Sequence, residues 1–419
     1  MNEELKNIPS KVNLDIFDVN NFSKDKIRDL FRAGKVPSAE VMIDEILLRS
    51  IKAEATDLHF EPTDNELRIR YGSEGVLKRL VSFPRDIADN LSSVIKTKAG
   101  LNAFEKKKPQ EGRFSLTLGN HQFDIRVSTI PVMAGERFAL RILAKSNRVA
   151  NLEELGFSSD NLEKIRKIIN KPIGLFLVTG PSNSGKSTTI YASVNDIQSP
   201  EKNIITVENP VEYKLDYASQ VQPSVDKSFT YVDALRAILR QNPNVIMLGE
   251  IRDAETGIVA AEAALYGNLV LSTILSNDAV GAILRRLLSL GVPTYWVATS
   301  LIGVVHQQLV RKICPDCKEE YKPTDQELAR LNPSLPEQAK FYHGKGCDQC
   351  KGTGYKGRTA IHEILVINDK IRDLIYLNSS MLTIKETARS LGFENIFDDA
   401  VKKLLNGITT IQEIQRAFG

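Results

Sequence analysis

The chain has 419 residues, a length that suits two or three domains with sizeable hydrophobic cores. Hydrophobic residues make up 42% and charged residues 26%, as in an ordinary soluble globular protein, and the net charge of +3 points to no nucleic-acid partner. No run reaches the roughly 18 apolar residues of a membrane helix, and the polar segment Met1–Ser10 lacks a signal-peptide core. These features predict a cytoplasmic protein.

The first third of the chain predicts a polar arm followed by a compact α+β domain at residues 39–145. Residues 1–38 are polar and charged, and we expect loosely held helical turns there. Apolar residues at helical spacing predict helices at Ala39–Ala53 and Pro84–Leu101. Short alternating runs bounded by turn residues predict strands at Asp57–Glu61, Glu66–Tyr71, Val76–Val81, Arg113–Leu118, Gln122–Pro131 and Arg137–Leu143.

Polar residues at Ala144–Asn151 predict a linker to a second domain at residues 152–419. Short apolar runs alternate there with helical segments, which indicates a doubly wound α/β fold. The predicted strands are Gly174–Thr179, Ile204–Glu208, Val245–Leu248 and Leu269–Thr273. The predicted helices are Leu152–Asn170, Ser187–Ile197, Tyr231–Arg240, Ala254–Tyr266 and Trp296–Val305. A cysteine-rich insert at residues 312–352 and a mostly helical part at residues 369–419 complete the prediction.

The segment from Gly180 to Ser187 fits the phosphate-loop pattern G-x-x-x-x-G-K-[ST], after a predicted strand and before a predicted helix. Its glycines let backbone N–H groups turn around an anion, at a helix N-terminus with partial positive charge. Lys186 supplies a cation for the β- and γ-phosphates, and the Ser187 hydroxyl is placed to ligate Mg²⁺. The residues predicted to bind ATP are Gly180, Pro181, Ser182, Asn183, Ser184, Gly185, Lys186, Ser187 and Thr188.

Acidic residues follow two of the predicted strands. Four apolar residues place Glu250 at the exposed carboxyl end of a buried strand, where open α/β sheets bind ligands. Glu250 is our candidate for orienting or deprotonating the attacking water. Glu208 and Glu212 lie at the end of another predicted strand. They are weaker catalytic candidates, and the alternative is that they are ordinary exposed acids.

The cysteines form two C-x₂-C pairs separated by the segment Lys318–Gly346. Four thiolates complete a closed tetrahedral site of the kind that holds structural Zn²⁺, with a redox pair or free thiols as alternatives. His343 and His362 lie nearby in the sequence, and we expect them to be surface or packing residues. The predicted zinc ligands are Cys314, Cys317, Cys347 and Cys350.

Together these segments resemble the hexameric ATPases of the type II secretion and type IV pilus assembly class, from about Ala39 to the C-terminus. The tetracysteine insert is typical of the assembly and export branch. Besides the phosphate loop and Thr188–Tyr191, Thr206–Tyr213 resembles the acidic box, and Leu235–Arg240 with Gly249–Asp253 resembles the Walker B region. A PAS-like N-terminal domain is matched by Ala55–Pro62, Pro109–Arg113, Asp124–Pro131, Gly135–Arg137 and Arg141–Leu143.

The resemblance implies a RecA-like ATPase domain, joined to the PAS-like domain and working in a homo-hexamer or a mixed ring. ATP would lie between the two domains, with Arg113, Arg126 and Arg141 completing a catalytic set of Glu250, Glu208 and Lys186. The alternative for each arginine is an ordinary strand surface. Hydrolysis would drive an inner-membrane platform protein of a pilus or secretion machine, which places the chain peripherally at that membrane.

The sequence departs from the family pattern at several positions. Asparagine replaces aspartate at residues 209, 242 and 244, residues 268 and 275 are Asn and Leu where the family has histidine, and Gly72 stands in place of an arginine. We expect these changes to cluster around the nucleotide and to slow hydrolysis. A motor enzyme is the leading interpretation. A weakly hydrolysing regulatory or scaffold paralogue is the alternative, and near-neutral charge disfavours a DNA-linked motor.

Overall fold

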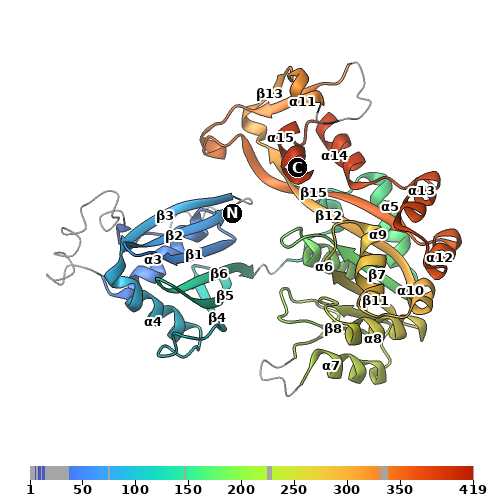
Figure 1. Cartoon of the computed structure of the whole chain (residues 1–419), viewed down its shortest axis with the longest axis horizontal. Coiled ribbons are helices and arrows are strands. Elements are labelled where there is room, and N and C mark those ends of the chain that lie inside the picture. The colour runs from blue at the N-terminus through green and yellow to red at the C-terminus, as the bar shows by residue number, and fades with distance from the viewer. Residues whose placement is uncertain are drawn as a thin grey trace. The chain divides into compact units, whose positions relative to one another are not determined.

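The computed structural model describes residues 5, 8–10, 12–14, 37–73, 76–145, 148–223, 229–329, 331 and 338–418. The chain forms two compact units, Met1–Ser146 and Asn147–Gly419, and each is described by itself (Figure 1). Within the described residues, no helix has both the length and the apolar character needed to cross a membrane.

The N-terminal unit is an antiparallel sheet of six strands with helices on one face (Figure 1). The strand order is β3-β2-β1-β6-β5-β4. Its strands are β1 (Asp57–Pro62), β2 (Glu66–Ser73), β3 (Val76–Pro84), β4 (Gln110–Leu118), β5 (His121–Val132) and β6 (Gly135–Lys145). Its helices are α3 (Ala39–Lys52), the short η2 (Arg85–Ile87) and α4 (Ala88–Lys98). This architecture confirms the expected α+β class, and the PAS-like assignment stays a prediction.

The core of this unit follows from its residue pattern. Alternate strand residues such as Leu58 and Phe60 are buried against apolar residues of α3 and α4, including Ile43 and Leu91. The expectation of a loosely held N-terminal arm is wrong for the part that the structure describes. Leu5 and Leu14 of that segment are buried in the same core. Most of the rest, including residues 15–36, lies outside the described residues.

The second unit contains a seven-stranded sheet with the order β15-β12-β7-β11-β10-β8-β9. All neighbouring pairs are parallel except β12 and β15. Its strands are β7 (Gly174–Thr179), β8 (Ile204–Val207), β9 (Ala218–Val221), β10 (Val245–Leu248), β11 (Leu269–Ile274), β12 (Leu301–Ile313) and β15 (Tyr355–Val366). Apolar clusters pack on both faces, which explains why the central strands are continuous apolar runs.

Helices cover both faces of this sheet, which confirms the predicted α/β class. They are η3 (Leu152–Leu155), α5 (Ser159–Ile169), α6 (Lys186–Ile197), α7 (Tyr231–Ile238), η4 (Leu239–Gln241), α8 (Ala254–Leu265), α9 (Ala279–Gly281), η5 (Ala282–Leu288) and α10 (Thr294–Ser300).

Three predicted segments differ from the structure. The expected helix Trp296–Val305 is divided, because α10 ends at Ser300 and β12 begins at Leu301. A buried parallel strand and a buried helix share the same unbroken apolar pattern, so the sequence does not separate them. The expected helix Leu152–Asn170 is interrupted at Gly156, whose φ of 83° is left-handed. The expected linker is shorter, because β6 extends to Lys145.

The cysteine-rich insert and the C-terminal helices belong to the second unit. The insert contains η6 (Pro315–Cys317), β13 (Lys318–Tyr321), α11 (Asp325–Ala329), β14 (Phe341–Gly344) and η7 (Asp348–Cys350). The C-terminal helices are α12 (Asp369–Tyr376), α13 (Met381–Ser390), α14 (Ile396–Leu405) and α15 (Ile411–Phe418). The Glu413 carboxylate accepts hydrogen bonds from the backbone N–H and the guanidinium of Arg311, at 2.6 to 2.9 Å, and so fixes α15 on β12.

Candidate nucleotide-binding site

The phosphate loop turns between the end of β7 and the start of α6. Gly180 and Gly185 have φ of 153° and 89°, which side-chain-bearing residues rarely adopt. A Cβ atom on Gly180 would lie 2.4 Å from the backbone oxygen of Gln307, so only glycine fits there. The Ser184 N–H donates to the Pro181 carbonyl oxygen at 3.3 Å inside the turn. The loop therefore presents backbone N–H groups at a helix N-terminus, as the motif predicts.

A buried glutamine on β12 braces this loop, and the sequence analysis missed it. The Gln307 side-chain Nε2 donates to the Ser184 carbonyl oxygen at 2.7 Å. Its Oε1 accepts from the Thr189 hydroxyl at 2.7 Å, and the residue is 1% exposed. Gln307 thus joins the loop to the first turns of α6. The one signal in the sequence is a Gln-Gln pair that interrupts the apolar run of β12.

Lys186 and Glu250 both lie at the carboxyl edge of the sheet. The Lys186 ammonium donates to the carbonyl oxygens of Gly180 at 3.0 Å and Pro181 at 2.8 Å. Burial lowers the pKa of Lys186, and the negative charge of Glu250 opposes that shift. Glu250 follows β10, is half-buried, and accepts a hydrogen bond from the Arg252 Nε at 2.8 Å. A cation and a carboxylate therefore share the edge where α/β sheets bind ligands.

Glu208 lies at the end of β8, but it is 2% exposed, so it is not the exposed acid that the sequence left open. Its Oε1 accepts hydrogen bonds from the Thr206 hydroxyl at 2.6 Å and from the Gln220 Nε2 at 3.1 Å. Its Oε2 accepts a hydrogen bond from the Tyr191 hydroxyl. The carboxylate is therefore held within a polar network beside the phosphate-loop helix.

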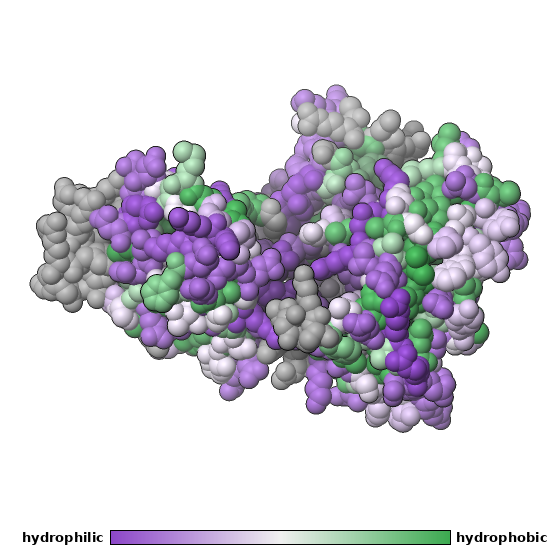
Figure 2. All heavy atoms as spheres, turned by 60° about the horizontal axis from the view of Figure 1, so that its bottom comes forward, coloured by the Kyte–Doolittle hydropathy of each residue, from purple (hydrophilic) through white to green (hydrophobic). Residues whose placement is uncertain are grey.

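The three predicted arginines lie in one row across the N-terminal sheet. Arg113 on β4 is directly opposite Arg126 on β5, and Arg126 is opposite Arg141 on β6. Directly opposed residues of an antiparallel sheet share a face, so the guanidinium groups project from one side. Arg141 donates to the Asp57 carboxylate at 3.1 Å on the next strand. In Figure 2, many hydrophilic side chains lie on the surface of this unit, in the left half of the picture.

The expectation that the substituted residues cluster around the phosphate loop is wrong for three of them. Asn244 directly precedes β10, Asn242 ends the helical turn two residues earlier, and Asn268 directly precedes β11. The phosphate loop instead follows the carboxyl end of β7, and these strands are parallel. The three asparagines therefore lie at the opposite edge. The strand that follows them spans about 13 Å for Asn242 and Asn244, and about 20 Å for Asn268. Asn209 and Leu275 follow β8 and β11 at the phosphate-loop edge.

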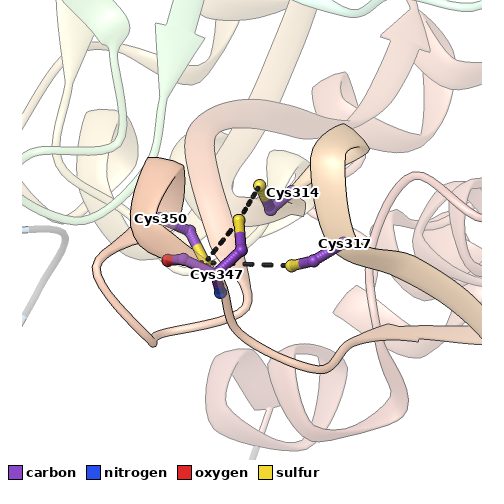
Figure 3. A group of neighbouring side chains, drawn as sticks. All are labelled: Cys314, Cys317, Cys347 and Cys350. Atoms are coloured by element: carbon purple, nitrogen blue, oxygen red, sulfur yellow. Dashed lines mark hydrogen bonds between the residues drawn. The ribbon is translucent and has the colours of Figure 1, made fainter.

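The four cysteines converge from two loops of the insert (Figure 3). Neighbouring Sγ atoms are 3.7 Å apart between Cys347 and Cys350, 3.8 Å between Cys317 and Cys350, and 3.9 Å between Cys314 and Cys347. All four Sγ atoms lie within 4.8 Å of one another. A tetrahedral ion with metal–sulfur bonds of about 2.3 Å requires sulfur separations of about 3.8 Å. The cluster therefore fits a tetrahedral metal ion.

The surroundings of Cys350 favour a thiolate, whereas burial raises the pKa of Cys314 and Cys317. Burial acts to raise the pKa of Cys350, but hydrogen bonds from the N–H groups of Cys347 at 3.1 Å and Gly354 at 3.2 Å outweigh it and lower that pKa to about 6. Neither nearby histidine joins the sulfur cluster. His362 is buried and stacks on Phe157 with ring centres 3.8 Å apart, which confirms a packing role.

The comparisons with known proteins agree with this geometry. A family model described as Type II/IV secretion system protein matches residues 33–416. The Type II secretion system protein E of Dickeya dadantii is 42% identical over 377 residues, covering 90% of this chain and 74% of that protein. The Type IV pilus assembly ATPase PilB of Thermus thermophilus is 42% identical over 379 residues, covering 90% of this chain and only 42% of PilB.

Two solved structures share the fold. The pilus retraction motor PilT with bound ADP has a TM-score of 0.61 at 25% identity, covering 89% of this chain and 96% of that chain. The Legionella pneumophila ATPase DotB has a TM-score of 0.65 at 19% identity, covering 90% and 95%, and supports the fold alone. The chain belongs to the type II/IV secretion system protein family, and its second unit has the P-loop ATPase fold of that family.

Proposed function

We propose that this chain is a motor ATPase that binds ATP at residues 180–188 and couples its hydrolysis to type IV pilus assembly or type II protein secretion. The observation that carries the proposal is the phosphate loop itself, whose turn between β7 and α6 holds Lys186, with Glu250 after the parallel strand β10 at the same edge of the sheet. The relatives named as a secretion protein and a pilus assembly ATPase support the coupling to one of these machines.

In this proposal each residue has a defined task. The N–H groups of the loop and the start of α6 bind the β- and γ-phosphates, and Lys186 exchanges its two carbonyl partners for phosphate oxygens. The Glu250 carboxylate orients the attacking water and accepts its proton. Arg252 holds one oxygen of that carboxylate, which leaves the other for water. The Ser187 hydroxyl would hold Mg²⁺, which neutralises phosphate charge when bound.

The finer organisation is also a proposal. Residues 39–145 form a PAS-like domain and residues 152–419 a RecA-like domain, in a homo-hexamer or a mixed ring attached to an inner-membrane platform protein. The aligned row of Arg113, Arg126 and Arg141 supports a role in phosphate contact, because guanidinium groups match phosphate oxygens bidentately. The four-cysteine cluster holds structural Zn²⁺, a proposal that the sulfur spacings support.

ATP hydrolysis by the purified chain, compared with Glu250→Gln, tests this function. We expect the variant to lose about 100-fold or more in turnover while keeping its affinity for ATP. Glu255→Gln is the matched control, because Glu255 is exposed on α8, where it pairs with Arg236 at 2.9 Å. The Glu255→Gln variant should hydrolyse ATP at the rate of the unaltered chain. An unaltered chain that neither binds nor hydrolyses ATP contradicts the proposal.

The predicted slow hydrolysis is decided by the same assay. Asn209 and Leu275 support it, because they replace an acid and a histidine at the phosphate-loop edge. A rate between about 1 and 100 s⁻¹, typical of efficient enzymes of this kind, contradicts an impaired site.

A further inference from the structure

A single buried hydroxyl connects the phosphate-loop helix to the loop that follows β8. Tyr191 is 2% exposed in the second turn of α6. Its oxygen accepts hydrogen bonds from the backbone N–H groups of Glu212 at 3.0 Å and Tyr213 at 3.2 Å. The same hydroxyl donates its proton to the Glu208 Oε2. It therefore contacts both the start and the end of the segment Glu208–Tyr213.

Both carboxylate oxygens of Glu208 accept hydrogen bonds within this network. Thr206 and Gln220 donate to its Oε1, and Gln220 also donates to the Tyr213 carbonyl oxygen at 2.8 Å. Burial, followed by the charge of Glu208, raises the pKa of Tyr191, so its hydroxyl keeps its proton at neutral pH and remains the donor. A carboxylate that is 2% exposed and bonded at both oxygens is a poor acceptor for a proton from water.

A second contact fixes the same segment to α6. The Tyr213 ring meets the Tyr191 ring edge-on, with ring centres 5.0 Å apart. The segment also borders the end of β10. The Gly249 N–H donates to the Val207 carbonyl oxygen at 2.9 Å, and a Cβ atom on Gly249 would lie 3.7 Å from the Glu208 Cα. A displaced segment would therefore disturb the backbone that carries Glu250.

We propose that Tyr191 is a positioning residue for ATP hydrolysis, whose hydroxyl locks the segment Glu208–Tyr213 to the phosphate-loop helix, with Glu208 as its buried acceptor and not as the catalytic base. The inference rests on the proposed ATPase function. Tyr191 lies five residues after Lys186, about 7.5 Å along the helix axis, so a shift of the helix upon phosphate contact reaches the segment through this hydroxyl.

A double-mutant cycle in the full chain tests the assignment. Tyr191→Phe and Glu208→Gln should each lower kcat by about tenfold, with the KM for ATP changed by less than about twofold. The double variant should be no slower than the slower single variant, because both changes break the same hydrogen bond. Ser193→Ala is the control on the same helix, because the Ser193 hydroxyl donates only within α6, to the Thr189 carbonyl oxygen at 2.8 Å, so its kcat should not change.

The opposite pattern overturns the inference. If Glu208 is the base, Glu208→Gln loses about 100-fold or more in kcat while Tyr191→Phe stays close to the unaltered chain.

Amide hydrogen exchange gives a readout that needs no turnover. In Tyr191→Phe the N–H groups of Glu212 and Tyr213 lose their acceptor, so their exchange should become faster in the nucleotide-free chain. Unchanged exchange at both amides contradicts the positioning role. An unaltered chain without ATPase activity contradicts the proposed function instead, and the exchange experiment still decides whether Tyr191 holds the segment.

Discussion

The two edges of the seven-stranded sheet use polar residues in different ways. At the amino-terminal edge, asparagines connect neighbouring strands. The Asn203 Nδ2 donates to the Gln241 and Asn242 carbonyl oxygens at 2.8 and 3.0 Å, and the Asn268 Nδ2 donates to the Pro243 oxygen at 2.6 Å. At the carboxyl edge, Lys186 and Glu250 are oriented by neighbours while they remain partly exposed.

The residues at the amino-terminal edge stabilise the sheet, whereas those at the carboxyl edge are placed to contact a ligand. Asn242 has a φ of 51°, a left-handed conformation that asparagine adopts more readily than most residues. The Asn244 Oδ1 accepts the Asn203 N–H at 2.8 Å. Both asparagines therefore have structural roles at this edge, at the opposite end of the strands from the phosphate loop.

The largest effect is expected at the carboxyl edge, from Lys186→Ala. Removing the ammonium should weaken ATP binding by about 10- to 100-fold, because a charge-assisted contact to phosphate is lost. Isothermal titration with ATP and Mg²⁺ measures the affinity. Lys167→Ala is the matched control, since Lys167 is exposed on α5 and pairs with Glu163. Equal affinities in the two variants would show that this edge is not the phosphate site.

The second prediction concerns the cysteine cluster, which continues from the end of β12 beyond the carboxyl edge. Chelation of the metal, or Cys347→Ser, should lower the unfolding midpoint of the chain by about 5 °C or more, because metal binding stabilises the folded insert. Metal analysis should find one ion in the unaltered chain and in His343→Ala, whose histidine bonds Glu319 at 3.0 Å outside the cluster. A metal-free chain with unchanged stability would contradict the zinc proposal.

The sequence was sufficient where the chemistry is local. The phosphate loop, β7 and the start of α6 are contiguous, so glycine spacing and an apolar run predict all of them. It was insufficient for Gln307, which reaches the loop from a strand distant in the sequence, and whose polar side chain gives no sign of its partners. The sequence also groups Asn268 and Leu275 in one motif, although β11 separates them and places them at opposite edges of the sheet.

The third prediction tests whether distant residues hold the carboxyl edge in place. Gln307→Leu keeps the volume but removes both hydrogen bonds to the loop and to α6, so the affinity for ATP should fall by about three- to tenfold. Gln308→Leu is the control, because adjacent strand residues point to opposite faces of the sheet. If both variants bind ATP like the unaltered chain, the loop keeps its shape without this brace.

The smallest effect is expected at the amino-terminal edge, and it is the sharpest test of the comparison. The first variant changes both Asn242 and Asn244 to aspartate. An aspartate at residue 244 still accepts the Asn203 N–H, and an aspartate at residue 242 still tolerates the left-handed backbone. The kcat should therefore change by less than about twofold.

The matched variant changes Asn209 to aspartate and Leu275 to histidine, which restores both family residues at the carboxyl edge. Its kcat should rise, by less than about tenfold, because an acid and an imidazole return beside the nucleotide. Steady-state ATP hydrolysis measures both variants. The distinction between the two edges fails if the Asn242 and Asn244 changes raise kcat while the Asn209 and Leu275 changes do not. Catalysis would then depend on the amino-terminal edge, whose hydrogen bonds join neighbouring strands.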